Sequence, residues 1–123
     1  LLVEYKNASI AGAAHPERFN PNFDNKLENV SSKFFYSMHW LYLAGKDKPR
    51  KCIYVLEYPA GNSTSRLLVR NELQNRIPFK LQSLLSDSGR KIIDEVRVVS
   101  IAEWNADAEV GKYPFQPITH LVT

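Results

Sequence analysis

Three histidines are the side chains in this sequence best suited to acid–base chemistry near neutral pH. Two histidines and a nearby cation can cleave RNA, because one takes the 2′-hydroxyl proton while the other protonates the leaving oxygen. His39 and His120, together with Lys91, would supply these groups. Their spacing does not require this role, since each also fits an ordinary strand or surface position. We therefore expect no catalytic residues, and a small metal-independent ribonuclease or toxin domain using His120 is the third of three interpretations.

The sequence offers no other enzyme signature. Cys52, the only cysteine, stands at the start of an apolar run, where a buried and unreactive thiol is the usual outcome. A single cysteine excludes an internal disulfide and a cysteine-rich zinc site. Glycine-rich phosphate loops, dinucleotide fingerprints and zinc-protease motifs are absent from the sequence. We expect neither a metal nor a cofactor.

A basic cluster beside aromatic residues is a candidate binding surface. Cations that follow a phosphate backbone, next to rings that stack on bases, are the parts of a single-strand nucleic-acid binder. The members of this cluster are Lys46, Lys48, Arg50, Lys51, Trp40 and Tyr42. The alternative is a solvated turn above an aromatic core, which the burial tendencies of aromatic residues favour.

The length of 123 residues suits one domain. We divide it into an arm and loop at 1–24, a core at 25–104 and an extended C-terminal segment at 105–123. The net charge of +3 favours acidic partners. A lone thiol is typical of a reducing compartment, so we expect an intracellular protein, cytoplasmic or organellar. No apolar run approaches the roughly 20 residues that span a bilayer.

The segment 25–44 supports two interpretations. Apolar residues recur every three or four positions, as on one face of a helix. Its second half is also dense in the aromatic residues that favour strands. We expect a short helix at 25–32 followed by a strand at 34–44.

The remaining pattern predicts an α+β fold. An edge strand is expected at 1–5, and strands at 52–58 and 66–70 are expected to form an antiparallel hairpin. The main helix is expected at 78–87, with Pro78 in its first turn. A strand at 91–102 alternates charged and apolar residues. The predicted fold is a small antiparallel sheet of about four strands, with this one helix on one face and extended N- and C-terminal arms.

Part of the chain resembles the small C-terminal domain of phycobilisome linker polypeptides. The resemblance covers 51–101 and depends on Val69-Arg70-Asn71, then Ile77-Pro78-Phe79, then Gly89-Arg90-Lys91-Ile92. Arg90 stands where that family has a second glycine, and residues 1–50 match nothing in it. The resemblance implies a non-enzymatic peptide packed within a ring of acidic subunits, with no cofactor of its own. It would give binding roles to Arg70, Asn71, Pro78, Phe79 and Lys91.

These observations favour a non-catalytic, linker-like protein-binding or assembly domain that works through a basic, aromatic-containing surface. The partner is expected to be a protein, and the net positive charge favours an acidic one. A single-stranded nucleic-acid-binding domain is the alternative. The sequence does not set the oligomeric state.

Overall fold

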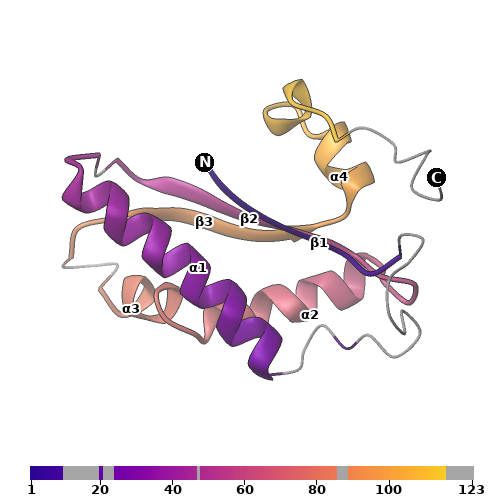
Figure 1. The fold of residues 1–123 in the computed structure, drawn as a ribbon, viewed down its shortest axis with the longest axis horizontal. Helices are drawn as coiled ribbons and strands as arrows, with labels where there is room; N and C mark the ends of the chain where they lie inside the picture. Colours follow the sequence, from indigo (N-terminus) through magenta and orange to yellow (C-terminus); the bar gives the residue numbers. More distant parts are fainter. Residues whose placement is uncertain (10–19, 21–23, 47, 86–88, 116–123) are drawn as a thin grey trace, which may run out of the picture.

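A computed structural model describes residues 1–9, 20, 24–46, 48–85 and 89–115. Within these residues helices and strands alternate along the chain and form layers on a central sheet (Figure 1). The elements in chain order are β1 (Leu2–Asn7), α1 (Asp24–Leu43), β2 (Arg50–Glu57), α2 (Ser63–Gln74), α3 (Phe79–Leu84), β3 (Ile93–Val99), α4 (Ile101–Ala106) and the 3₁₀ helix η2 (Val110–Lys112).

The sheet has three strands in the order β1-β2-β3, and both pairings are parallel. Parallel neighbours need a crossover connection, which α1 provides between β1 and β2, and α2 with α3 between β2 and β3. Two successive crossovers of the same hand that step in the same direction place their helices on the same face. Figure 1 shows α1, α2 and α3 together below the sheet and α4 on the opposite side.

The main core lies between the sheet and the three crossover helices. From β2 it receives every second side chain, Cys52, Tyr54 and Leu56, as the alternation of a strand requires. The helices contribute a further set of buried apolar residues: Leu27, Val30, Phe34, Met38, Val69, Leu73 and Phe79. This interface fixes how α1 and α3 lie over the sheet.

A second, smaller core covers the opposite face of the sheet. Ile53 and Val55 of β2 pack there with Trp104 of α4 and Val110 of η2. The indole nitrogen of Trp104 donates to the carbonyl of Tyr113 at 2.8 Å, which closes the C-terminal segment over this core. Because both faces are covered, β2 is a nearly continuous apolar run, as is usual for the central strand of a parallel sheet.

The predicted mixture of helices and strands is confirmed, but the predicted antiparallel sheet of about four strands is wrong. The segment 66–70 belongs to α2, so it forms no hairpin with β2. The Asn62 side chain accepts the Ser65 amide and the Ser65 hydroxyl accepts the Asn62 amide, a capping box that begins the helix. Because this segment is a helix, the chain crosses over between β2 and β3, and β3 runs parallel to β2.

The prediction of a strand at 34–44 is also wrong. Residues 34–43 continue α1, which ends before Gly45 with its positive φ of 78°. The repeat of apolar residues every three or four positions was therefore the correct signal, and the aromatic composition misled. The segment 105–115 is likewise not an extended arm, since it contains the end of α4 and η2. Residues 116–123 lie outside the described part of the chain.

A candidate binding groove between α1 and α3

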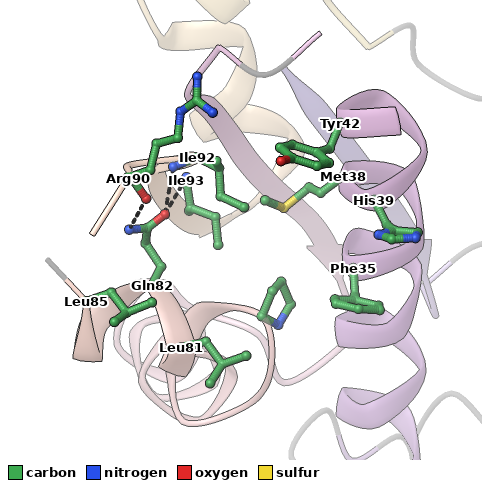
Figure 2. Close-up of a pocket in the computed structure, with 11 residues that line it drawn as sticks. Phe35, Met38, His39, Tyr42, Leu81, Gln82, Leu85, Arg90, Ile92 and Ile93 are labelled. Carbon is green, nitrogen blue, oxygen red and sulfur yellow. Dashed lines mark hydrogen bonds between the residues drawn. The ribbon is translucent and has the colours of Figure 1, made fainter. Parts of the chain in front are cut away.

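An apolar groove of about 340 Å³ lies between α1 and α3, against the beginning of β3 (Figure 2). Its lining residues are Phe35, Met38, His39, Tyr42, Pro78, Leu81, Gln82, Leu85, Arg90, Ile92 and Ile93. The volume falls in the range of ligand pockets, and aliphatic and aromatic side chains form most of the wall. We call this feature the α1–α3 groove.

Helical spacing produces both walls of the groove. Phe35, Met38, His39 and Tyr42 follow the spacing i, i+3, i+4 and i+7 on α1, so they share one face of that helix. On the other side Leu81 of α3 and Leu85, which follows it, are one turn apart, and Figure 2 shows both below the floor residues Ile92 and Ile93.

One polar side chain fixes the α3 wall to the floor. The Oε1 atom of Gln82 accepts the backbone amides of Ile92 at 2.7 Å and Ile93 at 3.0 Å. Its Nε2 atom donates to the carbonyl of Arg90 at 3.3 Å, and Figure 2 shows the three bonds together. The glutamine thus satisfies the amides at the beginning of β3 and connects α3 to the floor of the groove.

The second half of α1 exposes aromatic and aliphatic side chains beyond the groove. Tyr36, Trp40 and Leu43 lie one turn apart and are 69%, 65% and 70% exposed. Among residues 35–43 only Met38 is buried and only Leu41 is half-buried. An amphipathic helix normally presents polar residues to water. This half of α1 instead exposes apolar side chains on more than one side, which is typical of a helix that packs against other apolar groups.

A cationic hollow adjoins the end of the groove where Tyr42 lies. It shares Met38, Tyr42 and Ile92 with the groove. Its other members are Leu41, Lys46, Lys48 and Arg50. None of the described residues that line the groove or this hollow is acidic.

The predicted basic cluster is therefore divided between the two faces of the sheet. Lys46, Lys48 and Arg50 border the hollow, and the guanidinium of Arg50 makes a 3.4 Å contact with the carbonyl of Lys46. Lys51, the next strand residue, points to the opposite face. There it bonds Glu109 at 2.7 Å, and this bond raises the pKa of the ammonium group.

Among the remaining predicted binding residues, Arg70 and Phe79 have structural contacts, whereas Trp40 and Tyr42 are exposed. Both of these residues belong to α1, where Trp40 lies outside the groove and Tyr42 forms part of its wall. Arg70 donates from Nε to the carbonyl of Val96 at 2.9 Å and so occupies an acceptor of the outer strand β3. Phe79 is buried against Phe34, with ring centroids 5.7 Å apart.

The structure describes two of the three side chains considered for RNA cleavage, and only His39 of the two lines the groove. His39 lines the groove and stacks on Phe35, with ring centroids 6.0 Å apart. Lys91 is exposed and pairs with Asp94 at 3.1 Å. His120 lies outside the described residues, so the set as a whole stays a prediction.

At the carboxyl edge of the sheet, where open parallel sheets usually bind ligands, an ion-pair cluster surrounds the buried Arg66. Arg66 of α2 donates from Nε to the carbonyl of Leu56 at 2.8 Å and lies 3.4 Å from Glu57 and 3.8 Å from Glu103. Glu57 also accepts the amide of Ile101 at 2.6 Å. These side chains join β2, α2 and α4, and their hydrogen-bonding groups face one another.

Other chemistry is sparse in the described part of the chain. Cys52 is fully buried, and desolvation raises the pKa of its thiol to about 12, so it carries no thiolate at neutral pH. No group of three or more histidine, cysteine, aspartate or glutamate side chains among the described residues is arranged to hold a metal ion. None of the described helices combines the length and apolar character that crossing a bilayer requires.

The sequence-based reasoning identified Tyr42, Lys46, Lys48 and Arg50 but missed the groove itself. The helix expected at 78–87 was predicted to pack on one face of the sheet, whereas its Leu81 and Leu85 are 46% and 51% exposed. One available signal was the number of large rings in 34–43, which exceeds what a single buried face of a helix can hold.

Comparison of the chain with known protein families, with curated proteins and with solved structures finds no match.

Proposed function

We propose that this chain is a non-catalytic protein-binding domain that recruits or assembles with a partner protein through the α1–α3 groove. The observation that carries the proposal is the second half of α1, where one side forms the groove and the adjacent side exposes Tyr36, Trp40 and Leu43. Contiguous exposed apolar surface of this kind marks interaction sites on protein domains.

The extent of this surface favours a protein over a small ligand. A molecule confined to the 340 Å³ groove would leave Tyr36, Trp40 and Leu43 in water. Tryptophan and tyrosine are also the residue types most enriched among the energetically dominant residues of protein interfaces. A partner that enters the groove and continues over the outer side of α1 would cover both regions.

Selection from a displayed library of helical and extended peptides tests the proposal. We expect selected peptides to bind at least about tenfold more weakly to a Leu81→Asp/Leu85→Asp variant, because the charges would have to enter an apolar wall. Leu67→Asp/Leu68→Asp is the matched control, since these leucines are 52% and 55% exposed on α2 and lie outside the groove.

Two outcomes would contradict this function. Peptides that bind the groove variant and the control alike would place the binding surface elsewhere. A library that yields no binder, together with tight binding of a short single-stranded oligonucleotide that weakens as salt rises, would favour the nucleic-acid alternative.

A further inference from the structure

We infer that the occupant of the α1–α3 groove is an acidic amphipathic helix of the partner. This inference rests on the proposed protein-binding function and adds the conformation and charge of the bound segment. It follows from two independent observations, the shape of the helical layer and the distribution of charge around the groove.

The shape favours a helix because the groove is a gap between helices. Both walls present side chains at helical spacing, Phe35, Met38 and Tyr42 from α1 and Leu81 and Leu85 on the α3 side. A helix carrying apolar residues at every third or fourth position would interdigitate with both walls and complete the layer over the sheet.

An extended segment fits less well, because the nearby edge of β3 is already occupied. The amides of Ile92 and Ile93 donate to Gln82, and the carbonyl of Val96 accepts from Arg70. A strand added to β3 here would have to displace these side chains before it could form its own backbone bonds.

The charge distribution favours acidic side chains on the bound helix. Lys46, Lys48 and Arg50 border the adjoining hollow, while no described residue that lines the groove or the hollow is acidic. No carboxylate of a described residue forms an ion pair with Lys46 or Lys48. Acidic residues flanking the apolar face of the helix would meet these cations at the rim.

The same charges disfavour a second copy of this chain as the occupant. A symmetric dimer formed through the groove would bring the two sets of cations together, and like charges across an interface oppose association.

Three synthetic peptides of about 18 residues, long enough to be helical in solution, separate the inference from the proposed function. All carry the same leucine face, and their flanking positions hold glutamate, glutamine or lysine. We expect the glutamate peptide to bind about tenfold more tightly than the glutamine peptide at about 50 mM salt, with the lysine peptide weakest. The glutamate advantage should largely disappear at about 500 mM salt.

A charge variant and its matched control locate the effect. Lys46→Gln/Lys48→Gln should remove most of the difference in affinity between the glutamate and glutamine peptides. The matched control, Lys6→Gln/Lys112→Gln, changes the net charge equally at exposed sites outside the α1–α3 groove and the cationic hollow, and should leave this difference in place.

Equal binding of the glutamate and glutamine peptides, with both weakened by Leu81→Asp/Leu85→Asp, would overturn this inference and leave the proposed function standing. Binding of none of the peptides would overturn both. Tighter binding to vesicles of anionic lipid than to any peptide, with loss in the lysine variant, would also overturn the inference and assign the surface to a membrane.

Discussion

Arg66 shows how a charged residue becomes structural in this fold. Its guanidinium is almost fully buried and contacts the carbonyl of Leu56 and the carboxylates of Glu57 and Glu103. Burial of a charge is tolerated when its hydrogen-bonding capacity is used in this way. The same residue would be a candidate ligand-binding cation if only its type and its place near the carboxyl edge of the sheet were considered.

Substitution of Arg66 by Gln is therefore expected to lower the free energy of unfolding by about 3 kcal/mol, because Glu57 and the carbonyl of Leu56 lose their partner. Urea denaturation followed by circular dichroism measures the change. Adding Glu57→Gln to this variant should recover part of the loss, since an amide still accepts from Ile101 and leaves no unpaired charge. A loss below about 0.5 kcal/mol in the single variant, the size typical of surface changes, would show that the cluster is only a surface contact.

At the scale of elements, a short polar connection holds the C-terminal segment against the sheet. Asp107 ends α4, and its carboxylate accepts the amides of Glu109 at 2.8 Å and Val110 at 3.0 Å and pairs with Arg97 of β3 at 3.0 Å. The backbone bonds, followed by the arginine, lower the pKa of this carboxyl from 3.8 to about 2. The group therefore stabilises η2 and its packing in the charged form.

Because the pKa of Asp107 is lower in the folded protein than in the unfolded chain, its contribution to stability is present above pH 3.8 and is lost as pH falls towards about 2. We expect Asp107→Asn to reduce stability at pH 7 and to make stability less steeply dependent on pH between 4 and 2. Thermal unfolding at a series of pH values measures both effects. Parallel pH profiles for the variant and the original chain would contradict this assignment.

The elements differ in how far the sequence determined them. β1, β2, α3 and β3 were predicted near their observed places, because local alternation marks the strands and Pro78 precedes α3, although the end of the strand predicted at 91–102 belongs to α4. α2 was missed because its helical signal is a polar capping box, Asn62 with Ser65, which a strand-like Leu67-Leu68-Val69 run outweighed. Strand direction was missed with it, since an error at one crossover element converts a parallel sheet into a hairpin.

The groove was harder to predict than any element. Its residues come from α1, α3 and the beginning of β3. Local sequence patterns predict individual helices but not the distance between two of them. The bonds from the amides of Ile92 and Ile93 to Gln82, which connect α3 to the floor of the groove, join segments about ten residues apart through a side chain. Only the cations near Tyr42 could be located beforehand, because they are adjacent in the sequence.

At the scale of the whole molecule, the exposed aromatic surface of α1 has little part in the described intramolecular packing. Phe34 is almost fully buried and contacts Phe79, whereas its near neighbours Tyr36 and Trp40 are mostly exposed. A residue that stabilises the fold and a residue kept for a partner can thus be told apart by their effect on unfolding.

Replacement of Tyr36 and Trp40 together by Gln, which adds no charge, is expected to change the free energy of unfolding by no more than about 0.5 kcal/mol per site, because neither ring is buried in the described structure. Phe34→Ala, at a buried position two residues before Tyr36, should by contrast cost about 3–5 kcal/mol. The double variant should also bind the glutamate peptide more weakly, since the two rings would lie under the outer side of a bound partner. Urea denaturation and peptide titration of the same samples give both quantities. A loss of several kcal/mol in the double variant would mean that these rings pack within the chain's own fold, and the surface of α1 would then not be available to a partner.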